Sequence, residues 1–82
     1  MTNEEIITMQ DNLAAWGCGL WRDVMTEKHH RGQYDVGWAE VTILVPTMPK
    51  NNRLRLIFYA ADYPSALTEA YAKARSVMEL FA

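Results

Sequence analysis

The stretch AEVTILVPTMPKNNRLRLIFYA, residues 39–60, decides the fold of this chain. It contains the end of one β-forming run, residues 34–45, and all of a second, residues 53–60. Pro46 and Pro49 end the first run because proline has no N–H to donate to a sheet ladder. The polar connection over residues 47–52 is short, so we predict an antiparallel β-hairpin.

The register of this hairpin decides which side chains share a face. Burial is best when the apolar alternation of both strands points the same way, since a one-residue slip would turn one strand to the wrong face. The predicted inner face carries Val41, Ile43, Val45, Leu54, Leu56 and Phe58. The predicted outer face carries Trp38, Glu40, Thr42, Leu44, Arg55, Ile57 and Tyr59. Both faces of the hairpin therefore contain large apolar residues.

A helix is predicted directly after the hairpin. Asp62 or Tyr63 suits the cap position, and Pro64 suits the first turn, where its missing N–H is not needed. One apolar stripe at helical spacing follows, formed by Leu67, Ala70, Tyr71, Ala74, Met78 and Phe81. This single stripe needs one surface, and its small residues favour close packing on the sheet.

A second helix is predicted before the hairpin, with Thr2 or Asn3 as its cap. One apolar stripe of this segment consists of Ile6, Met9, Leu13, Trp16, Leu20 and Val24. The other consists of Ile7, Ala14, Cys18, Trp21 and Met25. Together they span an arc of about 200°, twice the roughly 100° that one contact needs, so we expect a helix buried on two sides. Gly17 and Gly19 each cost about 1 kcal/mol inside a helix, and we expect a kink there and a stop at Gly32.

These elements define one small α+β domain over residues 1–82, in the order α-β-β-α, with a long N-terminal helix, an antiparallel hairpin and a C-terminal helix packed on the sheet. The two helices could cover both sheet faces, or the second face could serve as an interface. Half of the 82 residues are hydrophobic, the net charge is −2 and there is one cysteine, so no disulfide forms within the chain. The N-terminus has neither the basic nor the apolar run of a signal sequence, and we expect a cytoplasmic protein without a membrane span.

Few residues suggest chemistry. Cys18 lies on an apolar stripe without a recognisable activating base, and His29 and His30 are adjacent rather than four apart as in a helical metal pair. The Gly17–Gly19 segment lacks the features of a phosphate loop. We therefore predict no enzyme, no cofactor and no metal site, while an activity based on Cys18 or the two histidines is kept as the third hypothesis.

A nucleic-acid interface is the second hypothesis. Lys50, Arg53 and Arg55 would meet phosphates, while Trp38 and Tyr59 would stack on bases. The chain as a whole is acidic and its basic residues are few. Lysine and arginine on a hairpin also discourage edge-to-edge aggregation, so this pattern does not require a nucleic acid.

Binding to another protein, including a second copy of the chain, is the function that the sequence favours. Tyr, Trp and Arg are enriched at the energetic centres of interfaces. The predicted partner-binding residues are Trp21, Met25, Trp38, Glu40, Leu44, Arg53, Arg55, Ile57 and Tyr59. In size, acidity and lack of a catalytic signature the chain resembles small phage and mobile-element inhibitors, such as anti-CRISPR proteins. This resemblance of class implies an inhibitor or regulator that occupies the surface of a partner.

Overall fold

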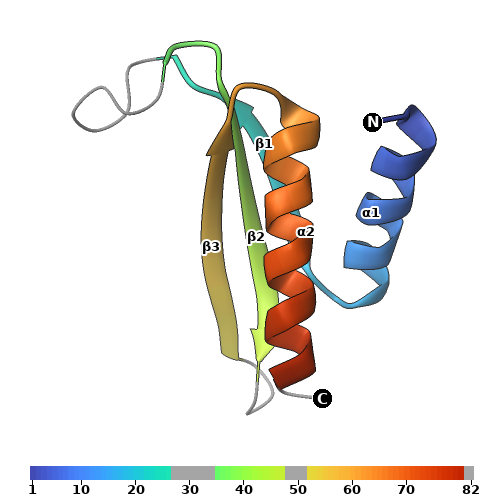
Figure 1. The fold of residues 1–82 in the computed structure, drawn as a ribbon. Helices are drawn as coiled ribbons and strands as arrows, with labels where there is room; N and C mark the ends of the chain where they lie inside the picture. The colour runs from blue at the N-terminus through green and yellow to red at the C-terminus, as the bar shows by residue number, and fades with distance from the viewer. Residues whose placement is uncertain (27–34, 48–51, 81–82) are drawn as a thin grey trace.

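A computed structural model describes residues 1–26, 35–47 and 52–80. Figure 1 shows helix α1 (Asn3–Ala15), three strands, β1 (Gly19–Val24), β2 (Ala39–Thr47) and β3 (Asn52–Ala60), and helix α2 (Tyr63–Leu80). The predicted α+β class, the hairpin and the C-terminal helix packed on the sheet are confirmed. The order of elements is α-β-β-β-α, because the segment after α1 forms a strand.

Helix α1 is shorter than predicted, and its two ends show why. Thr2 accepts a hydrogen bond from the Glu5 N–H, and the Glu5 side chain bonds back to the Thr2 N–H, forming a capping box. At the other end Gly17 has a φ of +79°, a left-handed conformation that favours glycine. The Cys18 N–H then donates to the Leu13 carbonyl at 2.9 Å and the Gly17 N–H to the Ala14 carbonyl at 3.0 Å. These two bonds form a Schellman motif, so the helix ends where we expected a kink.

The prediction that the helical stripes continue to residue 25 is therefore wrong. Residues 19–24 form β1, which pairs antiparallel with β2 and places Leu20 opposite Ile43. Leu20 and Val24 fit a helical stripe because they are four residues apart, but they also share one face of a strand. Pairing with β2 gives the backbone of this edge strand ladder hydrogen bonds along the side that faces β2.

The sheet has the order β1-β2-β3 and is antiparallel throughout. The predicted hairpin register is confirmed, since Val41 pairs with Phe58, Ile43 with Leu56 and Val45 with Leu54. Pro46 lies beyond the end of the β1 pairing, where no strand on that side requires its missing N–H. The sheet therefore has three strands instead of the predicted two.

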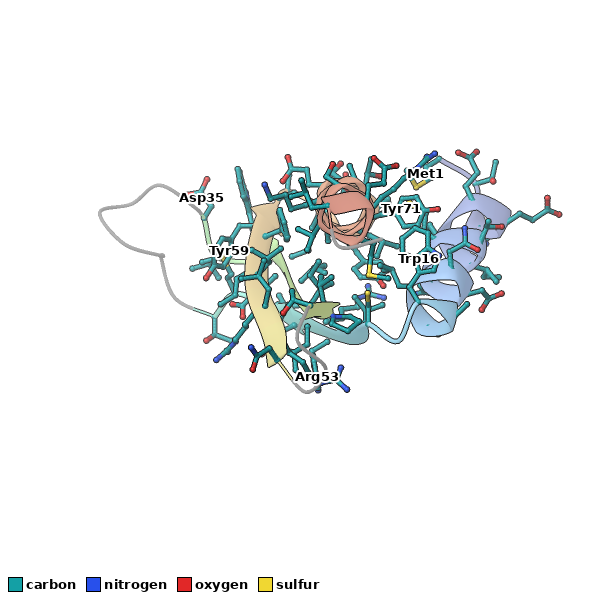
Figure 2. All side chains as sticks on the ribbon, turned by 90° about the horizontal axis from the view of Figure 1, so that it is seen from below. Met1, Trp16, Asp35, Arg53, Tyr59 and Tyr71 are labelled. Atoms are coloured by element: carbon teal, nitrogen blue, oxygen red, sulfur yellow. The ribbon has the colours of Figure 1, made fainter. Side chains whose placement is uncertain are left out.

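Both helices lie on one side of the sheet. Helix α2 covers β2 and β3, and α1 lies beside α2 and next to β1 (Figure 1). The core between the layers includes Val41, Ile43 and Val45, which are fully buried. Between the helices, the rings of Trp16 and Tyr71 stack with their centroids 5.2 Å apart, as Figure 2 shows. The second face of the sheet is therefore not covered by either helix.

Candidate functional site

The sheet face turned away from the helices is the candidate site, and we call it the open face. Cross-strand pairing arranges its side chains in rows, because directly paired residues point to the same side. The acidic row consists of Asp23, Glu40 and Tyr59. The central row consists of Trp21, Thr42 and Ile57. The basic row consists of Gly19, Leu44 and Arg55, with Arg53 opposite Pro46 one row further along. Figure 2 shows Tyr59 and Arg53 on the side of the sheet away from α2.

Burial alternates along β2 because its two faces have different surroundings. Val41 and Ile43 point toward α2 and have no exposed surface, whereas Glu40, Thr42 and Leu44 between and beside them are half-buried. On the edge strands the open-face side chains other than Tyr59 are more exposed, with Trp21 at 54% and Ile57 at 41%. Large apolar side chains at this exposure in one row of a sheet, here on either side of Thr42, are a feature of binding surfaces.

A glycine sets the position of the Trp21 ring. A Cβ placed on Gly19 would lie 2.7 Å from two ring atoms of Trp21, so the ring occupies the space over the glycine. The ring forms one wall of a shallow pocket of about 360 Å³ that is also lined by Thr42, Leu44 and Arg55. The pocket therefore combines aromatic, aliphatic and cationic side chains from all three strands.

Charges of opposite sign lie at the two ends of the open face. Asp23 and Glu40 pair directly across β1 and β2, and Arg55 lies two rows away opposite Leu44. Two rows correspond to about 13 Å along a strand. Within the described residues the one ion pair joins Arg75 to Glu79 on α2, at 3.5 Å, so these three open-face charges form no ion pair with another described residue.

Arg53 has a structural contact in addition to its place on the open face. Its guanidinium donates from Nη1 to the Gly17 carbonyl at 3.2 Å, which ties β3 to the turn that ends α1. Its charge also acts on Cys18, whose pKa is raised by burial and lowered to a smaller extent by Arg53. A buried thiol with a raised pKa remains protonated at neutral pH and is a poor nucleophile.

The structure brings most of the predicted partner-binding residues together. Six of them, Glu40, Leu44, Arg53, Arg55, Ile57 and Tyr59, share the open face as predicted from the hairpin. Trp21 joins them from β1, whereas we expected it on a helix. Trp38 is half-buried just before β2, and both Trp38 and Tyr59 make further interactions within the protein.

Met25 does not belong to this surface. Its side chain is 7% exposed, so the prediction of a contact surface at Met25 is wrong. Its backbone N–H donates to the Trp38 carbonyl at 2.9 Å and its carbonyl accepts from the Gly37 N–H at 2.8 Å. The backbone of Met25 therefore extends the pairing of β1 to the residues just before β2. Its buried side chain is not available to a partner.

Sequence reasoning missed Asp23 as a member of the site. It lies within the segment that we expected to be helical, while in β1 it alternates with Arg22 and Val24 and points to the open face. Arg22 points to the other face, where its guanidinium lies 4.1 Å from the centre of the Tyr63 ring. The sequence carries no clear strand signal here, because apolar Leu20 and Trp21 are adjacent and so are the charged Arg22 and Asp23.

The remaining chemical candidates have little support in the described residues. No three side chains able to bind a metal come together there, and no polar or charged side chain in these ranges is buried. His29, His30 and Lys50 lie outside the described residues. In the described parts of the chain, neither helix has the length and apolar character needed to cross a membrane. Comparisons with protein-family models, curated proteins and solved structures found no match.

Proposed function

We propose that this chain is a non-enzymatic protein-binding module that acts through the open face of its sheet. The observation that carries the proposal is the exposure of Trp21 and Ile57, which flank Thr42 in one row next to the row of Arg55, on a face that neither helix covers. Burying apolar area contributes about 25 cal/mol per Å², and an exposed tryptophan offers a large part of that area at little cost in conformational entropy.

Protein is favoured over nucleic acid because of the charges on the same face. Arg53 and Arg55 would attract phosphates, but Asp23 and Glu40 lie two and three rows away and would repel the same backbone. A protein surface offers both signs of charge together with apolar side chains, and it therefore matches all three parts of the open face.

An inhibitor or regulator that occupies a partner surface is the mode of action we propose. Such a mode needs a stable binding face and no catalytic groups, which fits a small phage or mobile-element inhibitor of the class that the sequence resembles. The open face supplies this binding surface on a sheet held by packed helices, and a rigid surface loses little conformational entropy on binding.

The test is photo-crosslinking in cells of the native host. A benzoylphenylalanine placed at Ile57 would probe the open face, and the same residue at Glu79, exposed on α2, serves as the matched control. We expect a covalent adduct with a protein, either a second copy or a different chain, from position 57. No adduct from position 57, or the same adducts from both positions, would overturn the proposed function.

A further inference from the structure

The open face carries charges of opposite sign on either side of an apolar row. A two-fold symmetric interface joins one patch to an identical patch, so the patch must carry its own complement. The central row is apolar on both edge strands, and the acidic and basic rows lie at equal distances on either side of it. Rotating a copy of this face by 180° about the central row therefore exchanges the two charged rows.

We propose that two copies of the chain pack open face to open face about a two-fold axis that passes over Thr42, perpendicular to the strands and parallel to the sheets. This inference rests on the proposed function and names a second copy as a partner for the same surface; a different protein binds that surface after the dimer dissociates. The central row of each copy then meets the central row of the other. Glu40 of each copy faces the row of the other copy that carries Leu44 and Arg55.

The charges decide between this arrangement and the other in-plane axis. An axis parallel to the strands would place Glu40 on Glu40 of the second copy, and two like charges in a partly dry interface repel. The axis perpendicular to the strands places Glu40 near Arg55 twice. Sheets that pack face to face are about 10 Å apart, a distance that a glutamate and an arginine reaching from opposite sides can span.

Neither Glu40 nor Arg55 forms an ion pair with another described residue, and a Glu–Arg contact between copies therefore adds an electrostatic contribution to association. The ion pair of the described residues lies on α2, away from the open face. The area is modest, since three strands about 4.8 Å apart form a footprint smaller than the roughly 800 Å² per partner of a standard interface. We therefore expect a dimer with a dissociation constant in the micromolar range.

The test exchanges the two charges and measures association by sedimentation equilibrium. Glu40→Arg alone places two arginines opposite each other at both ends, and Arg55→Glu alone places two glutamates there. We expect each single variant to weaken the dimer about tenfold or more. Mixing the two variants restores both Glu–Arg contacts in a heterodimer, and the double variant restores them in a homodimer. Both should associate within about threefold of the original affinity.

Lys73→Glu, a charge reversal on the exposed side of α2, is the matched control and should leave association unchanged. A measurement without any substitution covers the case in which a variant fails to fold. On dilution of the unmodified chain, we expect the backbone amide NMR signals of Trp21 and Ile57 and the indole signal of Trp21 to shift. The backbone amide signals of Arg75 and Glu79 should stay constant.

Three results would overturn the dimer. In the first, the chain is a monomer at all concentrations up to about 500 µM. In the second, neither charge reversal changes the dissociation constant of the dimer. In the third, both single variants dimerise weakly but fail to associate when they are mixed. A monomeric chain that still forms an adduct with a different protein from position 57 contradicts the dimer and leaves the proposed function in place. The absence of any adduct from that position contradicts both.

Discussion

At the scale of single residues, Asp62 shows how one side chain organises the largest helix. It lies just before α2, and its Oδ1 accepts a hydrogen bond from the Ser65 N–H at 2.8 Å, as an N-cap does. The backbone and side-chain hydrogen bonds from Ser65 lower the pKa of the Asp62 carboxyl group. These bonds favour the charged form, since an ionised carboxylate is the better acceptor.

The lowered pKa of Asp62 predicts a pH dependence of stability. Because the pKa is lower in the folded chain, the stabilisation is complete above the pKa of the unfolded chain and is lost as the pH falls through the folded value. Asp62→Asn keeps a hydrogen-bond acceptor but does not titrate. We therefore expect the melting temperature of this variant to fall less than that of the unmodified chain below about pH 4. Asp62→Ala should lower the melting temperature at pH 7 by a few degrees.

Circular dichroism melts of the three proteins between pH 2 and pH 7 check this prediction. The comparison of Asp62→Asn with the unmodified chain isolates Asp62 from the other carboxylates, which all three proteins share. An identical acid-induced loss of stability in both would contradict the role of the charged cap.

At the scale of elements, the turn between α1 and β1 depends on the backbone of Gly17. Its φ of +79° costs a residue with a side chain roughly 1 kcal/mol, while the nearest atom to an added Cβ, Cγ of Pro46, is 3.8 Å away. We expect Gly17→Ala to lower the free energy of unfolding by about 1 kcal/mol through backbone strain alone, with the position of the Trp21 ring unchanged.

Gly19→Ala is the informative contrast to Gly17→Ala. An added Cβ at Gly19 meets the Trp21 ring at 2.7 Å, so the ring must move while the backbone need not. We expect a changed chemical shift of the Trp21 indole N–H in Gly19→Ala and not in Gly17→Ala, measured by NMR alongside urea denaturation. The opposite pattern would contradict the ring position over Gly19.

The contrast between the hairpin and β1 shows what sequence reasoning could reach. Val41, Ile43 and Val45 are two residues apart, as are Leu54, Leu56 and Phe58, so the pairing of β2 with β3 was predictable. The strand end was not, because β2 continues through Pro46 to Thr47. Leu20 and Val24 have a spacing that fits a helix and a strand equally well. The choice between them is made by the Schellman turn at Gly17 and by the unpaired side of β2, and the second of these is a tertiary property.

The same difference explains how much of the candidate site was predictable. The part of the open face on β2 and β3 follows from the hairpin register, and Arg55, Ile57 and Tyr59 were placed together. The contribution of β1 was not, because Trp21 and Asp23 reach this face only through a strand that was assigned to a helix. The separation of charges that supports the dimer depends on Asp23 lying beside Glu40. This pairing exists only when β1 is part of the sheet, and it could not be predicted from a helix.

At the scale of the whole molecule, the sheet has one side that packs against the helices and one side that neither helix covers. Ile43 and Ile57 are a matched pair for this division, since both are isoleucines in paired strands. Ile43 points between the sheet and α2 and is fully buried, while Ile57 points to the open face and is 41% exposed. Removing one methyl group should therefore have different consequences at the two positions.

We expect Ile43→Val to lower the free energy of unfolding by about 1 kcal/mol, because the lost methyl group leaves a small cavity in the core. Ile57→Val should change the free energy of unfolding by less than about 0.3 kcal/mol. This holds when urea denaturation is measured at protein concentrations below the dissociation constant of the dimer. At protein concentrations above that constant, dimer formation adds stability by mass action. The destabilisation caused by Ile57→Val should then increase, because residue 57 contacts the central row of the second copy. Equal costs at both positions in the monomer would show that a further part of the chain covers the open face, and the division of the sheet into two sides would then be wrong.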